Sequence, residues 1–333
     1  MKAAYKTPAG TVTFKEITLR PLKMDEIRLK MDACGICGTD LHFDPNAAAE
    51  AQFGHEIAGT VLETGAAVTN VKPGDHIVLD SATPCGFCAQ CKNGRQELCT
   101  DIKSIWFVPS FGFAEEVIAP AISAVPNPGL DPAVASISEP LGVAIDMHRL
   151  ADIGIGSHVV VSGLGPIGLM ALRLAKLSGA EKIYACDVSK AKARLQVARD
   201  FGADEIIEVD KTPLADYKFA VKPDRFMVSS PPVTLPTMFK IAAKGAIISF
   251  IGIKFGDGAT ISFDANDFHF KKLQLRASFA SPAMFTPQAL NLLKTGAVDG
   301  RRLISHRFPL DKIGDALVCA RNVEEAIKVV VTQ

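Results

Sequence analysis

The sequence predicts a two-domain α/β protein, with a β-rich domain followed by a domain built on a parallel sheet. Three observations predict it. The chain has 333 residues, enough for two domains of roughly 100 to 200 residues each. Residues 1–140 alternate short apolar runs with Gly, Pro and Asp, which is typical of strands and turns. From about residue 157, strand-like and helix-like stretches alternate, as they do in βαβ units.

The individual elements follow from the same patterns. In the first part, Gly59–Glu63 and His76–Leu79 have the composition of strands. In the second part the predicted order is strand Val159–Val161, helix Ile167–Ser178, strand Lys182–Cys186, helix Lys190–Phe201, strand Arg225–Val228, helix Leu235–Lys244 and strand Ala246–Gly252. Such an alternation favours a parallel sheet covered by helices.

Two other segments are less regular. Between Val209 and Met227 the two prolines Pro213 and Pro223 leave little room for a helix, so one crossover of the sheet is predicted to be short. In the final stretch, Pro287–Thr295 and Val323–Val330 are predicted to be helices, and this stretch is expected to pack back on the first domain.

Charge and hydropathy exclude several classes of partner. The 36 basic and 36 acidic residues balance, so the chain lacks the broad positive field that nucleic acids or anionic membranes attract. The longest apolar runs are the length of strands, far shorter than a membrane span. The N-terminus has no pattern of a secretory signal, so we expect a cytoplasmic protein with a small-molecule partner.

A glycine fingerprint indicates a dinucleotide site. The strand at Val159–Val161 leads into Gly163-Leu164-Gly165-Pro166-Ile167-Gly168 and then a helix. In this order the first glycine allows a tight turn, the second a close approach to a pyrophosphate, and the third close helix packing, while the helix N-terminus attracts the anion. Asp187 ends the next strand, where an acid binds the adenosine ribose hydroxyls.

Asp187 also predicts which dinucleotide is bound. A carboxylate there repels a ribose phosphate, and no arginine directly follows it, so NAD is favoured over NADP. Lys190 and Lys192 could oppose this preference, but lysines at the start of a helix are more often simply solvated.

Two groups of residues have the spacing of metal ligands. Cys85, Cys88, Cys91 and Cys99 fall within fifteen residues and could close a tetrahedral, structural zinc site. The second group combines Gly35–His42 with Gly54–Gly59, and so offers thiolate, imidazole and carboxylate. Three protein ligands with an open fourth position are typical of a catalytic zinc, although an isolated Cys or His is more often a packed structural residue.

Together these motifs resemble the zinc-containing medium-chain dehydrogenase/reductase family. The resemblance spans the chain in the order Cys37-Gly38-Thr39-Asp40-x-His42, His55-Glu56-x-x-Gly59, the four cysteines and the glycine fingerprint. Ser138-Glu139-Pro140-Leu141 is similar to the sorbitol dehydrogenase branch, in which glutamate replaces a cysteine ligand. Ala280 stands where such polyol dehydrogenases tend to place an arginine near the substrate, so sorbitol itself is not indicated.

The resemblance implies a fold and a set of roles. It implies a GroES-like β-rich catalytic domain from residues 1–140 and 280–333, with a structural zinc lobe at 85–99, and a Rossmann domain with a doubly wound parallel sheet at 141–279. It implies two Zn²⁺ ions per subunit and a homodimer or homotetramer. It also implies a catalytic zinc bound by Cys37, His55 and Glu56, with Glu139 binding directly or through water. Thr39 and His42 would form a proton relay.

The predicted function is that of a zinc-dependent, NAD-dependent dehydrogenase acting reversibly on a secondary hydroxyl of a polyol, sugar or sugar acid. An alternative from another class is a nucleotide-binding or redox-sensing protein that has kept the fold without the chemistry, because a fold alone does not fix a function. The presence of Cys37, Glu56 and the relay residues favours the enzyme.

Overall fold

The structure is a computed structural model that describes residues 1–42, 49–105, 112–254, 256 and 258–333. The chain forms two compact units. The first contains Met1–Gly142 and Ala280–Gln333, and the second contains Val143–Phe279. Within the described ranges, every helix is too short or too polar to cross a membrane.

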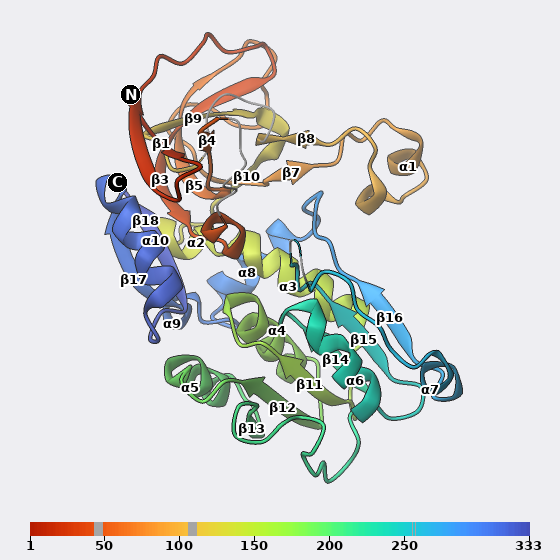
Figure 1. Cartoon of the computed structure of the whole chain (residues 1–333). Coiled ribbons are helices and arrows are strands. Elements are labelled where there is room, and N and C mark those ends of the chain that lie inside the picture. The colour runs from red at the N-terminus through yellow and green to blue at the C-terminus, as the bar shows by residue number, and fades with distance from the viewer. Residues whose placement is uncertain (43–48, 106–111, 255, 257) are drawn as a thin grey trace. The chain divides into compact units, whose positions relative to one another are not determined.

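The first unit is built on one large, mostly antiparallel sheet (Figure 1). In the described residues its strand order is β10–β6–β5–β3–β18–β17, and β9 also pairs with β3. The strands are β3 (Glu26–Gly35), β5 (Glu56–Thr64), β6 (His76–Leu79), β9 (Glu116–Pro120), β10 (Ala124–Pro126), β17 (Ile304–Pro309) and β18 (Lys328–Thr332). Its central strands therefore come from both ends of the sequence, with β18 antiparallel to β3.

Shorter elements surround this sheet. Strands β1 (Lys2–Lys6), β2 (Val12–Glu16) and β4 (Ala51–Gln52) form one small sheet, and β7 (Ala82–Thr83) pairs with β8 (Lys103–Ser104). The helices and turns are η1 (Gly38–Leu41), α1 (Ala89–Lys92), η2 (Gln96–Leu98), η4 (Ala121–Ser123), α2 (Pro132–Ser136), α8 (Thr286–Lys294), α9 (Gly300–Leu303), η6 (Leu310–Lys312) and α10 (Ile313–Asn322).

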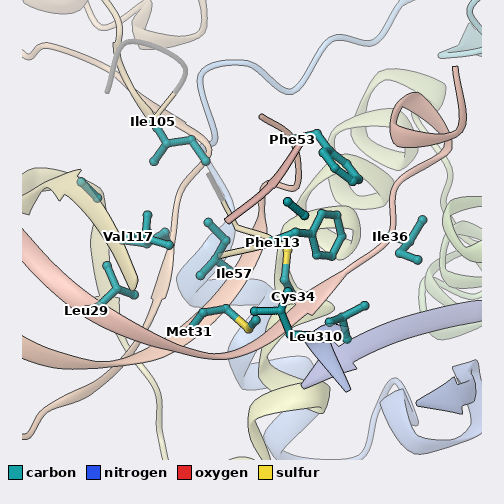
Figure 2. Close-up of a cluster of buried hydrophobic side chains, with 14 of the residues drawn as sticks. Leu29, Met31, Cys34, Ile36, Phe53, Ile57, Ile105, Phe113, Val117 and Leu310 are labelled. Atoms are coloured by element: carbon teal, nitrogen blue, oxygen red, sulfur yellow. The ribbon is translucent and has the colours of Figure 1, made fainter. Parts of the chain in front are cut away.

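The core of the first unit lies against β3 and β5 (Figure 2). Leu29 and Met31 alternate along β3, and Cys34 follows after a shift in the strand register; all three are fully buried, as Ile57 of β5 nearly is. Phe113 packs beside them, with its ring centroid 4.9 Å from that of Phe53. Since each large apolar side chain contributes about 1.5–3 kcal/mol when buried, this cluster holds the sheet together and fixes where its strands end.

The second unit contains a sheet whose strands are all parallel. Its order in the described residues is β13–β12–β11–β14–β15–β16 (Figure 1). The strands are β11 (His158–Ser162), β12 (Lys182–Asp187), β13 (Glu205–Glu208), β14 (Arg225–Val228), β15 (Ile247–Phe250) and β16 (Gln274–Ala277). The chain adds strands first on one side of β11 and then on the other, and this is the doubly wound arrangement. In such sheets the ligand crevice lies beyond the carboxyl ends of the strands where the order reverses, here β11 and β14.

Helices connect these strands, and three of them lie where the sequence predicted: α4 (Pro166–Leu177), α5 (Lys192–Asp200) and α6 (Leu235–Ile241). The structure adds η5 (Pro232–Thr234) and α7 (Ala265–Phe270), which were not predicted, while α3 (Ser138–Ala151) leads into the unit. The short crossover is also confirmed, because residues 209–224, all of which the structure describes, contain turns and no helix between β13 and β14.

One predicted helix is wrong. Val323–Val330 was expected to be helical, but Val323 terminates α10 and Lys328–Thr332 form strand β18. The run Val329-Val330-Val331 is buried at every position, and β-branched side chains buried on both faces favour a central strand over a helix.

Candidate active site

Cys37, His55 and Glu56 meet at one end of the main sheet of the first unit. Cys37 follows the end of β3, while His55 and Glu56 stand at the beginning of β5, and antiparallel pairing sets Gly35 opposite Glu56. One potential ligand atom of each of the three residues lies within 4.8 Å of the others. A thiolate, an imidazole and a carboxylate at this spacing can hold one zinc ion and leave a fourth position open.

Asp40 supports this group, although the motif alone indicated no role for it. Its Oδ2 accepts a hydrogen bond of 2.9 Å from the backbone N–H of Cys37, and its Oδ1 lies 4.0 Å from Nδ1 of His55. Burial by itself would lower the pKa of His55, but Cys37, Glu139 and Asp40 together raise that pKa well above its usual value. Surroundings that favour a positive charge on His55 also favour a bound cation.

Glu56 is paired with Lys328, a lysine that is only 2% exposed. Nζ of Lys328 lies 2.5 Å from each of the two carboxylate oxygens of Glu56. The lysine therefore balances the charge of this buried carboxylate, one oxygen of which belongs to the group of potential metal ligands. Burial would lower the pKa of Lys328, but Glu56 and Cys37 raise it.

Glu139 stands near these residues on the second position of α3. Its Oε1 accepts a hydrogen bond of 3.0 Å from Oγ of Ser81. It is not one of the three residues whose ligand atoms lie within 4.8 Å of one another. Its negative charge nevertheless acts on His55, Glu56 and Lys328.

Of the two predicted relay residues, Thr39 lies in the 3-10 turn η1 and His42 directly follows this turn. The backbone N–H of His42 donates to the carbonyl of Thr39 at 3.3 Å, and both side chains are exposed. Two cations hold this turn in place, since Lys6 donates to the carbonyl of His42 at 3.0 Å and Arg321 donates to the carbonyl of Leu41 at 2.6 Å. The turn therefore presents a hydroxyl and an imidazole on a fixed backbone.

The four cysteines of the lobe form a second group of potential ligands. One atom from each of Cys85, Cys88, Cys91 and Cys99 lies within 4.8 Å of the others, and all four are free thiols. Backbone N–H groups of Cys91 and Thr100 lower the pKa of Cys88 to about 5. Four sulfur atoms around one point fit a tetrahedral zinc with no open position.

The glycine fingerprint lies between β11 and α4 in the second unit. Gly163 has φ of +87°, a conformation that favours glycine, and a Cβ at Gly168 would collide with the carbonyl oxygen of Gly163. A Cβ at Gly165, by contrast, would meet open space, as the second glycine of a phosphate-binding loop requires. Pro166 starts α4, so the N–H groups of its first turn are open to an anion.

Asp187 lies at the end of β12 beside this loop. Its Oδ2 accepts from the N–H of Leu164 at 2.9 Å, and its Oδ1 accepts from the N–H of Val188 at 2.7 Å. A second acid, Asp210 from the turn after β13, contacts this loop, because it accepts from both the N–H and the hydroxyl of Ser189, each at 2.7 Å. The loop after β12 therefore begins at one carboxylate and is bonded to another.

Comparison with known proteins identifies the family. The alcohol dehydrogenase GroES-like domain matches residues 23–129, and the zinc-binding dehydrogenase domain matches residues 166–295. L-threonine 3-dehydrogenase of Bacillus velezensis is 34% identical over 328 residues, which cover 93% of each chain. The chain belongs to the zinc-dependent medium-chain alcohol dehydrogenase family.

Solved structures agree with this assignment. An alcohol dehydrogenase from Escherichia coli CFT073 in complex with NADH has a TM-score of 0.89 at 25% identity, and the alignment covers 100% of this chain and 99% of that one. A zinc-binding dehydrogenase from Sinorhizobium meliloti 1021 bound to NADP has a TM-score of 0.89 at 28% identity, with the same coverage. L-idonate 5-dehydrogenase from Escherichia coli reaches 0.87 at 25% identity, covering 100% and 98%.

These findings confirm the predicted family, the GroES-like and Rossmann folds, and the use of zinc and a nicotinamide dinucleotide. The individual site residues of this dehydrogenase stay predictions. Lys328 had no signal in the sequence, because it lies far along the chain from Glu56 in a segment predicted to be helical.

Proposed function

We propose that this dehydrogenase oxidises a secondary hydroxyl with NAD at the Cys37, His55 and Glu56 site. The observation that carries the proposal is the meeting of a thiol, an imidazole and a carboxylate, since one potential ligand atom of each of Cys37, His55 and Glu56 lies within 4.8 Å of the others. Zinc bound there would act as a Lewis acid that lowers the pKa of a substrate hydroxyl. Glu139 supplies a further carboxylate, binding directly or through water.

Thr39 and His42 move the proton in this proposal. The hydroxyl of Thr39 accepts the proton of the substrate, and His42 passes it on by way of the cofactor ribose toward solvent. Both side chains are exposed on a turn that Lys6 and Arg321 hold in place, so they are open to a substrate and to water. Proton transfer by a positioned side chain of this kind is general acid–base catalysis.

The second unit binds the dinucleotide and sets the preference for NAD. The backbone of Gly163–Gly168, including Pro166 and Ile167, would hold the pyrophosphate at the N-terminus of α4. Asp187 would bind the adenosine ribose hydroxyls. Asp210, fixed to Ser189, adds a second negative charge that opposes the 2′-phosphate of NADP, against the positive charges of Lys190 and Lys192.

The names of the relatives add one class of candidate substrate. L-Threonine and L-idonate, on which two of them act, are both carboxylic acids with a secondary hydroxyl. We therefore include hydroxylated amino acids beside the polyols, sugars and sugar acids indicated by the sequence. Selection among them depends on a few pocket contacts worth about 1–3 kcal/mol each.

The test is the initial rate of NADH formation by zinc-loaded protein over a panel of these compounds, repeated with NADP. We expect an NAD-preferring rate that Cys37→Ser abolishes, with a relaxed preference in Asp210→Asn. Turnover by Cys37→Ser at the wild-type rate would contradict the proposed site. NADH binding without turnover or catalytic zinc would instead support a binding or sensing protein.

We also propose a homodimer or homotetramer, as the family resemblance implies. Light scattering of the purified protein measures the mass of the assembly, and a monomer would contradict this part of the proposal.

A further inference from the structure

Asp210 lies beside the loop that follows β12. Strand β13 pairs with β12, with Glu208 opposite Asp187, and the N–H of Val209 then donates to the carbonyl of Asp187 at 3.0 Å (Figure 1). The next residue, Asp210, stands in the turn that begins the short crossover between β13 and β14. The pairing of the two strands therefore fixes Asp210 next to the residues that follow Asp187.

The carboxylate of Asp210 binds both hydrogen-bond donors of Ser189. Its Oδ1 accepts from the backbone N–H and its Oδ2 accepts from the hydroxyl, each at 2.7 Å. Distances this short are typical of hydrogen bonds to a charged acceptor. The same two bonds lower the pKa of Asp210, so the group is a carboxylate at neutral pH. The N–H and the hydroxyl of Ser189 are therefore both used within the protein.

Donors at this place would otherwise suit the 2′-phosphate of NADP. Asp187, at the end of β12, is the acid proposed to bind the hydroxyls of the adenosine ribose, which carries the 2′-phosphate in NADP. Ser189 lies only two residues further along the same loop. Proteins bind phosphate oxygens with backbone N–H groups, hydroxyls and cationic side chains. Ser189 has the first two, and the exposed Lys190 and Lys192 supply the third.

We propose that Asp210 is a specificity-determining residue that excludes NADP by occupying both donors of Ser189, in addition to repelling the phosphate by its charge. The inference rests on the proposed binding of NAD beside Asp187, and it deepens that proposal. The loop after β12 then contains a set of phosphate-binding groups that Asp210 blocks. Asp187 opposes NADP independently, so loss of Asp210 should weaken the preference for NAD without reversing it completely.

The test separates the charge of Asp210 from its hydrogen bonds. The variants are Asp210→Ala, Asp210→Asn, Ser189→Ala and the double variant of Asp210→Ala with Ser189→Ala. Asp216→Asn, which changes an exposed carboxylate of the same crossover, is the control. One readout is the ratio of kcat/KM for NADP to kcat/KM for NAD. The second is the ratio of the affinities for adenosine 2′,5′-bisphosphate and adenosine 5′-monophosphate, measured by calorimetry, which requires neither zinc nor turnover.

Asp210→Ala frees both donors of Ser189 for the phosphate. Because hydrogen bonds to a charged acceptor are strong, both ratios should rise roughly 10- to 100-fold. Asp210→Asn removes the charge, but its amide oxygen can still accept from Ser189. Since exposed charges interact weakly, both ratios should rise by no more than about 5-fold in this variant. Asp216→Asn should change them by less than about 2-fold.

Ser189→Ala tests the hydroxyl directly. When it is added to Asp210→Ala it removes one of the freed donors, so it should cancel roughly 3- to 10-fold of the gain. Alone it should leave both ratios close to those of wild type, because the hydroxyl of Ser189 is already bonded to Asp210.

Equal gains in Asp210→Ala and Asp210→Asn, unaffected by Ser189→Ala, would mean that only the charge of Asp210 opposes NADP, and this result would overturn the inference. Ratios that stay at the wild-type value in Asp210→Ala would overturn it as well. Wild-type protein that prefers NADP to NAD would instead contradict the proposed use of NAD.

Discussion

Asp80 shows how a single residue can make the stability of the protein depend on pH. It is buried and accepts a hydrogen bond from Thr286. Burial and, to a smaller extent, the charge of Glu139 raise its pKa from 3.8 to about 6, against the lowering effect of this hydrogen bond. Since the folded state holds the proton more tightly than the unfolded state, the stability from this group is complete below pH 3.8 and is lost as the pH rises through about 6.

Asp80→Asn should remove the loss of stability that wild type shows as the pH rises. We expect zinc-free Asp80→Asn to be more stable than wild type at pH 8 by up to ~3 kcal/mol, with little difference below pH 4. The measurement is the free energy of urea unfolding as a function of pH. Asp315→Asn, which changes an exposed carboxylate, should leave the profile of wild type unaltered, and an equally large change there would argue against burial as the cause.

Thr39 is the residue whose loss should affect catalysis alone. Thr39→Val removes the hydroxyl proposed to accept the substrate proton and should lower kcat by roughly 10²- to 10⁴-fold. Because the side chain is exposed, the unfolding midpoint and the zinc content should stay those of wild type. Thr39→Ser keeps the hydroxyl and should retain most of the activity. Equal loss in both variants would mean that the hydroxyl is not the proton acceptor.

Most of the site residues could be predicted from sequence because each stands in a short motif. Cys37 and His55 lie beside glycines at strand ends, and the glycine loop is contiguous. Lys328 could not be predicted in this way. Its role depends on which strands are neighbours in the sheet, and the pairing of β18 with β3 joins residues almost 300 positions apart.

Among the elements, α2 has a well-defined N-cap that can be tested separately from its ion pair. Oδ1 of Asp131 accepts hydrogen bonds from the N–H groups of Ala133 and Val134 at 3.1 and 3.3 Å, and the same oxygen lies 3.0 Å from Arg307. Both side chains of the ion pair are largely exposed, so the pair should contribute little. The N-cap should therefore contribute more to the free energy of unfolding than the ion pair does.

Asp131→Ala should therefore cost about 1 kcal/mol of unfolding free energy. Arg307→Ala, which removes the ion pair and keeps the cap, should cost less than half as much. Urea unfolding of the two variants under identical conditions gives the comparison. A cost for Arg307→Ala that matches that of Asp131→Ala would assign the stabilisation to the ion pair.

The elements also show where sequence patterns are reliable. The strands and helices predicted for the second unit lie within a few residues of their predicted positions, because their apolar runs alternate with glycine turns and longer helix-compatible stretches. The prediction was wrong for β18. Val329, Val330 and Val331 are all buried, so the sequence there has no hydrophobic periodicity that distinguishes a strand from a helix. A short apolar run of this kind cannot be assigned to a helix or a strand without knowing its neighbours.

For the whole molecule, the two predicted zinc sites should separate stability from activity. Cys88→Ser should release the zinc of the lobe and lower the Tm, because a structural zinc contributes directly to folding, and each kcal/mol lost lowers the Tm by roughly 2–4 °C. Cys37→Ser should abolish activity with a much smaller effect on the Tm. Metal analysis gives the zinc content, thermal unfolding gives the Tm, and the initial rate gives the activity. If Cys37→Ser lowered the Tm and Cys88→Ser abolished activity, the structural and catalytic assignments of the two sites would have to be exchanged.

The order of the strands in the main sheet has a consequence for synthesis on the ribosome. The strand β10 ends at Pro126, but β18, which completes the edge of β3, begins only at Lys328. At about 5–20 residues per second, roughly 200 intervening residues take about 10–40 s to translate. During that time the residues of β3 near Gly35 lack the strand that they finally pair with. The nascent chain therefore exposes an unpaired strand edge, to which other chains can bind. We expect chaperones that bind such edges to be needed most in this interval, before Lys328 has been synthesised and can pair with Glu56.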